Sequence, residues 1–295
     1  GDSGAIALAV QSPVVALRLF ATNVGDSGAA ALAKNARIKS LSLSDTNITI
    51  KGARALAQNK TIKHLDFGGD WLGDRRPNDI GDAGAIAFAK NNSLESLELD
   101  SQQITTVGAN ALAKNNSLRS LGLRANYGLK DDGAIALARK SLNSLDLGAC
   151  TLTDKAIFAL AQKKYQTLLA YSNFISDQGA VALAKNHSIK ELYLLVNDIH
   201  DEGALAFATY GTMDFLDVTF NRMSQIGITL IDNHGGWLAG FENPYPSRTQ
   251  VFKFLREIFD SKLNRQEFHK SICYRTKYRI ECRNPKNLLL PRTEM

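Results

Sequence analysis

The stretch Gly133-Ala-Ile-Ala-Leu-Ala138 is one copy of a six-residue motif, Gly-Ala-x-Ala-[Leu/Phe]-Ala, that returns along most of the chain. Exact copies or close variants begin at Gly4, Gly28, Gly52, Gly84, Gly108, Gly133, Ala156, Gly179, Gly203 and Gly227. Eight of the nine steps between them are 23 to 25 residues long, and one is 32 residues long. Self-similarity at this period is typical of a solenoid, in which each repeat stacks only on its neighbours. The repeat therefore decides the fold.

A second pattern, Leu-x-x-Leu-x-Leu, lies between successive motifs, as in Leu118-Arg-Ser-Leu121-Gly-Leu123. Its last leucines alternate with other residues as on a strand, whereas the apolar residues of the Gly-Ala motif recur at helical spacing. Each repeat is therefore predicted to be a short strand followed by a helix. Stacked repeats of this kind give an α/β solenoid, curved, with a parallel sheet on the concave face and helices on the convex face.

Two polar residues stand at fixed distances from the motif. An Asp lies two residues ahead of it in most repeats, as at Asp26 and Asp177. A carboxylate there can accept the unpaired amide hydrogens at a helix start. An Asn often lies seven residues after the motif begins, as at Asn59 and Asn186. Asn tolerates the left-handed conformation that closes a helix, so the sequence predicts Asp and Asn as the two helix caps.

A third polar position lies three residues after the last apolar residue of each strand. A buried polar side chain there can hydrogen-bond the turn backbone of neighbouring repeats. The position holds Thr22, Thr46, Asp70, Gln102, Asn126, Cys150, Asn173, Asn197 and Asn221. A packing role is thus favoured for Cys150 over that of a nucleophile.

These repeats resemble the ribonuclease-inhibitor-like subfamily of leucine-rich repeats, and in detail the short GALA type of bacterial effectors. The resemblance covers about residues 1–236. The resemblance implies a module that recognises a protein. It also implies a Legionella-like bacterial effector, which a type III or type IV secretion system delivers into the cytoplasm of a host cell. GALA-type effectors of plant pathogens carry an F-box ahead of the repeats, and no such segment is visible. Because the sequence opens at Gly1 inside a motif, an upstream domain stays an open alternative.

Residues 237–295 are expected to form a second, basic helical domain. They hold twelve Lys and Arg against six Asp and Glu, whereas residues 1–236 hold twenty-three of each. A first helix with one apolar stripe is predicted after Pro246, and a second, basic helix over 266–280. The stripe consists of Val251, Phe254, Leu255, Ile258 and Phe259. These helices are expected to cap the last repeat, since a solenoid end otherwise exposes its core. The alternative is weak binding of RNA or anionic lipid by the basic face.

The concave surface is the expected partner site, because the residues between the strand leucines point there. Its middle is acidic, with Asp66, Glu98 and Asp100, and its carboxy-terminal end is apolar. A solvated strand face would be polar throughout, so the apolar end indicates that a partner or the tail covers it. The apolar candidates are Leu169, Tyr171, Tyr193, Leu195, Phe215 and Phe220, of which Tyr171, Tyr193, Leu195 and Phe220 are expected to form one patch. Aromatic residues dominate protein interfaces, which favours a protein partner over a small molecule.

The single 32-residue step places eight extra residues in the segment 68–79. Insertions in solenoids form loops, often on the binding side. Trp71, Arg75 and Arg76 have the composition of an interface hot spot, which makes them candidate partner residues. The alternative is a loop folded back on its own repeat.

Catalytic, cofactor-binding and metal-binding residues are not predicted. The five His are scattered over unrelated positions of the repeat, and none pairs with Cys or Glu at the spacing of a metal or nucleophile site. Cys150, Cys273 and Cys282 form no disulfide framework, so a reducing compartment is expected. The sequence therefore predicts a monomeric, non-catalytic protein that binds a host protein. An adaptor or ubiquitin-ligase-related effector, active in an upstream or carboxy-terminal segment, is the second hypothesis.

Overall fold

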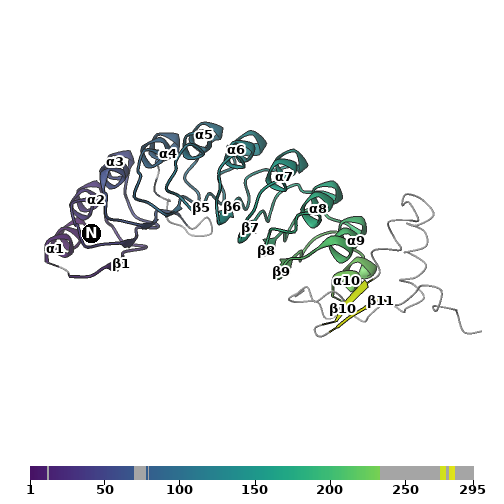
Figure 1. Cartoon of the computed structure of the whole chain (residues 1–295). Helices are drawn as coiled ribbons and strands as arrows, with labels where there is room; N and C mark the ends of the chain where they lie inside the picture. The colour runs from purple at the N-terminus through teal and green to yellow at the C-terminus, as the bar shows by residue number, and fades with distance from the viewer. Residues whose placement is uncertain (12, 70–77, 79, 233–272, 277–278, 283–295) are drawn as a thin grey trace, which may run out of the picture.

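A computed structural model describes residues 1–11, 13–69, 78, 80–232, 273–276 and 279–282 (Figure 1). Nine short strands pair in chain order into one parallel sheet. They are β1 Ala16–Arg18, β2 Ser40–Ser42, β3 His64–Asp66, β4 Ser96–Glu98, β5 Ser120–Gly122, β6 Ser144–Asp146, β7 Thr167–Leu169, β8 Glu191–Tyr193 and β9 Phe215–Asp217. Each strand is followed by a helix, as the repeat pattern predicts.

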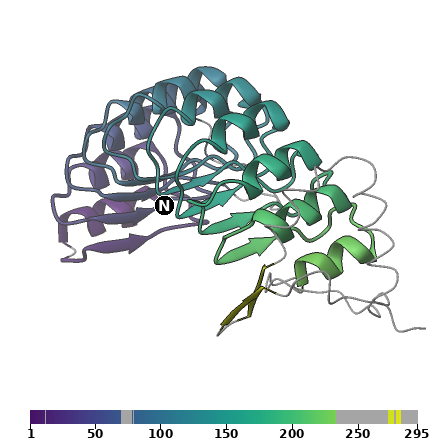
Figure 2. The ribbon, with the colours of Figure 1, turned by 45° about the vertical axis from the view of Figure 1, so that its right-hand side comes forward.

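The helices stand in a row on the outer side of the arc, and the strands line the inner side (Figures 1 and 2). They are α1 Asp2–Gln11, α2 Asp26–Ala33, α3 Ile50–Gln58, α4 Gly81–Ala89, α5 Thr106–Leu112, α6 Lys130–Leu137, α7 Asp154–Leu160, α8 Asp177–Ala184, α9 Asp201–Tyr210 and α10 Gln225–Asp232. The predicted fold class, a curved α/β solenoid, is confirmed.

The core is continuous because equivalent residues of successive repeats lie side by side. Leu97 of β4 is in register with Leu121 of β5, and both are buried. The first Gly of the motif allows neighbouring helices to approach. A Cβ on Gly108 would lie 2.9 Å from the Cβ of Ala85 in the preceding helix and 2.7 Å from Ile104. Such contacts are too short for a side chain, which explains why the motif begins with glycine.

The buried polar position after each strand forms a ladder of hydrogen bonds between repeats. The Asn126 amide donates to the carbonyl oxygens of Leu99 and Leu123, at 2.9 and 2.8 Å. Its side-chain oxygen accepts the backbone N–H groups of Gln102 and Ile104. Asn173, Asn197 and Asn221 repeat the pattern. The predicted role of this position is confirmed.

In the repeat with the insertion, Asn78 takes the ladder position that the sequence frame gives to Asp70. The Asn78 amide donates to the Leu43 carbonyl at 2.8 Å, and its oxygen accepts the Ile48 N–H at 3.2 Å. Asn78 thus has the role that was predicted for Asp70, which itself lies outside the described residues. The eight extra residues stand between Gly69 and Asn78, ahead of the ladder residue and not behind it.

The Asp residues accept helix-start N–H groups, but those of the next repeat. Asp26 Oδ1 accepts the N–H groups of Thr49 and Gly52, both at 2.9 Å, and Oδ2 accepts the Thr49 hydroxyl at 2.7 Å. Thr49 caps its own helix by accepting the Lys51 N–H. Partial burial acts to raise the pKa of Asp26, but these hydrogen bonds lower it overall. Asp therefore accepts helix-start N–H groups, as predicted, but these groups belong to the helix of the following repeat and not to its own helix.

The prediction that Asn closes each helix in the left-handed conformation is wrong. Asn59 has φ −63° and ψ 139°, which is extended backbone. From there its amide donates to the Ala33 carbonyl at 2.8 Å, and its oxygen accepts the N–H groups of Thr61 and Ile62. The side chain thus forms a second ladder between repeats. Positive φ angles recur instead at the turns after the strands, as at Ala125 and Val196.

Part of the expected second helix of the carboxy-terminal segment is also wrong. β10 Cys273–Thr276 and β11 Arg279–Cys282 pair as antiparallel strands, with Cys273 and Cys282 in register. The β-branched and aromatic residues in these short runs favour strand over helix. The rest of 237–295, with the apolar stripe predicted to cap the last repeat, lies outside the described residues, and the boundary at 236 stays a prediction. Within the described part of the chain, no helix has the length and apolar character that crossing a membrane requires.

Candidate functional site

One row of outward-pointing residues crosses the concave face at the last position of each strand. The register places Asp66 beside Glu98, and Tyr193 beside Leu169 and Asp217. Gly122 and Asp146 continue the row between Glu98 and Leu169. The concave positions read from the sequence are therefore neighbours in space, and their role in binding stays a prediction.

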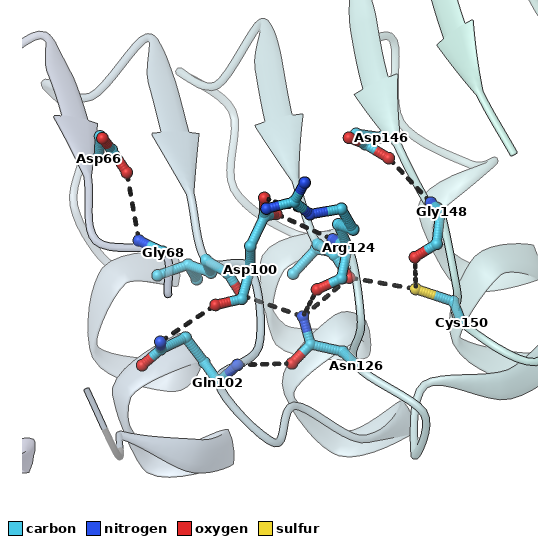
Figure 3. A network of polar contacts seen from close by, with 11 residues as sticks. Asp66, Gly68, Asp100, Gln102, Arg124, Asn126, Asp146, Gly148 and Cys150 are labelled. Carbon is cyan, nitrogen blue, oxygen red and sulfur yellow. Dashed lines mark hydrogen bonds and ion pairs between the residues drawn. The ribbon is translucent and has the colours of Figure 1, made fainter. Parts of the chain in front are cut away.

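Four carboxyl groups interact over β3 to β6 and form what we call the acidic cluster: Asp66, Glu98, Asp100 and Asp146. Figure 3 shows Asp66, Asp100 and Asp146 with Arg124. Arg124 is the cation among them. Its Nε lies 3.2 Å from Asp100 Oδ2, and its backbone N–H donates to Asp100 Oδ1 at 2.9 Å. Asp146 accepts the Gly148 N–H at 2.8 Å. The charge of the cluster is thus only partly compensated within the repeats.

Three members of the acidic cluster, Glu98, Asp100 and Asp146, have raised pKa values and so hold protons more tightly than free carboxyl groups do. Burial, reinforced by the negative charges of Asp100, Asp146 and Asp66, raises the pKa of Glu98 to about 8. Burial and Asp146 raise the pKa of Asp100 to about 6, although Arg124 acts to lower it. At neutral pH Glu98 therefore carries a proton in most molecules, and it can donate a hydrogen bond as well as accept one.

Glycines in the outward positions make room for these side chains. A Cβ on Gly122 would overlap the carboxyl group of Glu98, and one on Gly68 would lie 3.2 Å from the Cβ of Asp100. The side chain of Glu98 thus crosses the backbone of the neighbouring strand β5. Small residues at these positions are the sequence signal that side chains of one repeat fold over the next.

Tyr171 belongs to the acidic cluster and not to the apolar patch in which the sequence placed it. Its ring lies over Gly148, where a Cβ would come within 2.6 Å of a ring carbon. The Tyr171 hydroxyl hydrogen-bonds the side chains of Arg124 and Asp146, and burial raises its pKa to about 12. The missing side chain at Gly148 explains why Tyr171 leans toward the acidic residues.

The apolar patch is centred on two aromatic rings. The ring centroids of Tyr193 and Phe215 lie 4.9 Å apart, with an angle of 35° between the planes. Leu169 and Leu195 beside them are half-buried. Phe220 is 69% exposed, in the turn after β9, at a positive φ of 54°. We use the name apolar patch for Leu169, Tyr193, Leu195, Phe215 and Phe220.

The insertion follows strand β3, which carries Asp66 of the acidic cluster. Gly69 is the last residue described before it and donates its N–H to the Asp100 carbonyl at 2.9 Å. Trp71, Arg75 and Arg76 lie outside the described residues. Their candidate role in partner binding stays a prediction.

A hollow of about 440 Å³ extends the concave site toward β1. It is lined by Arg18, Phe20, Ser42, His64, Asp66 and Glu98, among others. Arg18, Phe20 and Arg124 are site residues that the sequence did not single out as candidates. Their signal in the sequence is weak, because only their position in the repeat frame sets them apart from other surface residues.

The described residues include no group of three or more His, Cys, Asp or Glu that could hold a metal ion, and this covers the acidic cluster. Cys150 is fully buried, and its thiol donates to the Leu123 carbonyl at 3.1 Å. Burial raises the pKa of this thiol to about 12. Cys150 therefore serves the ladder, since a nucleophilic cysteine needs a lowered pKa.

Comparison with protein families gives a match to a leucine-rich repeat family, over residues 34–57, 77–89, 140–161 and 185–208. Three of the matched segments run through a strand into the following helix, β2 to α3, β6 to α7 and β8 to α9, and the segment 77–89 contains α4. No curated protein matches the chain.

Among solved structures, the chain is similar to an internalin (InlF) of Listeria monocytogenes, with 20% identity and a TM-score of 0.48. The match covers 75% of this chain and 59% of the internalin. It is also similar to a chain of the yeast Rad7 and Elc1 complex, with 15% identity, a TM-score of 0.44 and coverage of 78% and 73%. A third similarity is to the ectodomain of the Arabidopsis receptor kinase HAESA, with 16% identity, a TM-score of 0.43 and coverage of 68% and 37%. At these identities and scores, the similarities say nothing about function.

The family match and the strand-helix repeat with its two ladders lead to the same conclusion. The chain folds as a leucine-rich repeat solenoid, and a leucine-rich repeat family model matches four of its segments.

Proposed function

We propose that this protein is a non-catalytic module that binds a protein partner through its concave face. The observation that carries the proposal is the apolar patch, where the rings of Tyr193 and Phe215 contact each other and remain half-exposed. Leucine-rich repeat domains generally mediate protein–protein interaction. Aromatic side chains on such a surface supply much of the energy of binding when a partner covers them.

The acidic cluster complements the apolar patch. It lies over β3 to β6, next to the apolar patch over β7 to β9 on the same face, so that a partner contacting both spans several repeats. Its charge attracts a basic segment of the partner, which raises the association rate and makes it sensitive to salt. The proposed partner therefore combines an apolar anchor with Lys or Arg.

The origin of the partner is a separate part of the proposal. The resemblance of the Gly-Ala motif to GALA-type effectors supports a bacterial effector that acts in the cytoplasm of a host cell. The partner would then be a host protein, and the loop with Trp71, Arg75 and Arg76 would add contacts at the acidic end. Placement of Cys150 in the buried ladder agrees with a protein made for a reducing compartment.

The test is affinity capture from a eukaryotic lysate with the intact chain, followed by mass spectrometry. The variant Tyr193→Ala/Phe215→Ala serves as the negative bait, and Phe158→Ala on the outer helix α7 serves as the matched control, since Phe158 is 46% exposed. We expect proteins that the intact chain and the control retain and the double variant loses. A set of captured proteins that is the same for all three baits contradicts the proposed site.

A further inference from the structure

The loops that lead from each helix to the next strand are strongly basic. The eight loops are 34–39, 59–63, 90–95, 113–119, 138–143, 161–166, 185–190 and 211–214. They contain fourteen Lys and Arg but only two acids, Glu95 and Asp214. The basic residues are Lys34, Arg37, Lys39, Lys60, Lys63, Lys90, Lys114, Arg119, Arg139, Lys140, Lys163, Lys164, Lys185 and Lys190. We call this set the basic edge.

All of these loops lie on one edge of the solenoid, because every strand of the sheet is parallel and every loop enters a strand at its amino end. Figure 1 shows the helices nearly end-on along the arc, so that their ends face the two edges. The first turns of the helices, on the opposite edge, hold nine Asp and Glu. Residues 1–236 are neutral as a whole, yet their charge is separated across the solenoid.

Interactions within the repeats account for only a few of these cations. Lys63 pairs with Glu95 at 3.0 Å, and Lys190 lies 3.9 Å from Asp214. Lys140 is buried and donates to the Asn115 carbonyl. The other eleven are exposed and form no ion pair with a described residue.

The helix dipole explains part of the pattern. Lys34, Lys90 and Lys185 stand at helix carboxy-terminal caps. A cation there is stabilised by the negative end of the helix dipole. The effect fades within the last turn, so it does not reach the residues that lie just before the strands, such as Lys39 and Arg119. The excess of cations on this edge therefore calls for an external anion.

We propose that the basic edge docks the protein on the anionic headgroups of a lipid bilayer. The cations follow the arc of the repeats, and a flat layer of headgroups can meet all of the loops, whereas a straight nucleic acid duplex would meet only a few. Stacking platforms for single-stranded nucleic acid are missing from the edge, because the one Phe, Trp or Tyr in these loops, Tyr165, is 2% exposed. Each Lys or Arg near an anionic membrane strengthens the attraction to it.

This orientation leaves the concave face free. The sheet would stand upright on the membrane, with the acidic edge turned away from the headgroups. A partner could then approach the apolar patch and the acidic cluster from the side while the protein stays docked. The docking is electrostatic, since the edge offers no exposed aromatic residue for insertion among the described loops.

The test is co-sedimentation of the full chain with vesicles of phosphatidylcholine and phosphatidylserine, and with vesicles of phosphatidylcholine alone. The edge variant is Lys60→Glu/Lys163→Glu/Lys164→Glu. The control, Lys51→Glu/Arg54→Glu/Lys130→Glu, makes the same change in charge on exposed residues outside the basic edge. A second edge variant, Lys39→Glu/Lys90→Glu/Lys114→Glu, provides an independent test in case the first does not fold. Thermal melts verify the fold of each variant.

We expect binding to the phosphatidylserine vesicles only, weakened by salt, with a partition coefficient at least about tenfold lower in both edge variants than in the control. Equal binding of edge variants and control would overturn the proposal and would assign the binding to another basic segment, such as the tail. No sedimentation with phosphatidylserine vesicles would overturn it as well. Binding of duplex RNA in a parallel assay, without binding of the vesicles, would also overturn the proposal.

Discussion

The acidic half and the apolar half of the concave face are built on the same backbone but present opposite chemistry. Over β3 to β6, the outward side chains fold over glycines of neighbouring repeats, as Glu98 does over Gly122, and some of them pair, as Arg124 does with Asp100. Over β7 to β9, Tyr193 and Phe215 contact each other and remain half-exposed. Polar side chains of the acidic half form some of their hydrogen bonds and ion pairs within that half. The apolar half, by contrast, is covered only when a partner binds.

The largest effect is expected where the two halves join, at Asn173. Its side chain bonds the carbonyl oxygens of Leu147 and Ala170 and the N–H groups of Cys150 and Leu152. Asn173→Ala leaves these buried groups without partners, so we expect a loss of about 3 kcal/mol in the free energy of unfolding. Denaturant unfolding measures it, with Asn143→Ala, an exposed residue, as a control that changes stability by less than about 0.5 kcal/mol. Equal stability of the two variants would show that the ladder does not link the halves.

The second prediction separates the halves by their effect on binding. Tyr193→Ala/Phe215→Ala should weaken the affinity for a captured partner by tens-fold, since truncation of an interface hot spot costs about 2 kcal/mol or more. Asp66→Asn in the acidic half should mainly slow association at low salt. Calorimetry and stopped-flow kinetics measure the two effects. If Asp66→Asn reduced affinity more than the aromatic double variant did, the acidic half would be the principal site.

The third prediction uses pH to sharpen the contrast. Burial and nearby acids raise the pKa of Glu98 from its ordinary 4.5 to about 8 in the folded protein. Between these values the folded state binds more protons than the unfolded state, so stability should fall as pH rises from 5 to 8. Glu98→Gln cannot lose a proton, so its melting temperature should exceed that of the parent protein at pH 8 and approach it at pH 5. If the melting temperatures of variant and parent differed by the same amount at every pH from 5 to 8, the pKa of Glu98 would not be raised.

The smallest effect is expected for Tyr171→Phe, which removes only the hydroxyl that bonds Arg124 and Asp146. A hydrogen bond of this kind contributes about 1 kcal/mol. The pKa of Asp146, already raised by burial, should rise further without it. Carboxyl titration by NMR measures that shift, with Tyr193→Phe as the matched control in the apolar half. A change of the same size in the control would mean that Tyr171 is not part of the acidic cluster.

The fold could be predicted from the sequence because its signals are local. The alternation of Leu121 and Leu123 and the helical spacing within Gly133 to Ala138 each lie inside one repeat. What the sequence missed depends on stacking between repeats. Asp26 serves a helix that begins more than twenty residues later, and Tyr171 turns toward a glycine of the preceding strand.

The acidic cluster shows the same limit. Asp66, Glu98 and Asp100 could be identified from their positions in the repeat frame, but the crossing of Glu98 over Gly122 follows from side-chain packing across two strands. Asn78 was missed for another reason. An insertion of eight residues can be placed before or after the ladder position without changing the period, and only the hydrogen bonds to Leu43 and Ile48 decide between the two.

The central claim is that a protein partner covers the apolar patch on the concave face. Hydroxyl-radical footprinting of the complex with a captured partner tests it most directly, because it reports the exposure of individual aromatic side chains. We predict reduced oxidation of Tyr193, Phe215 and Phe220 in the complex, with no change at Phe158 on the outer helix α7. Protection of Phe158 with unchanged oxidation of Tyr193 and Phe215 would contradict the account.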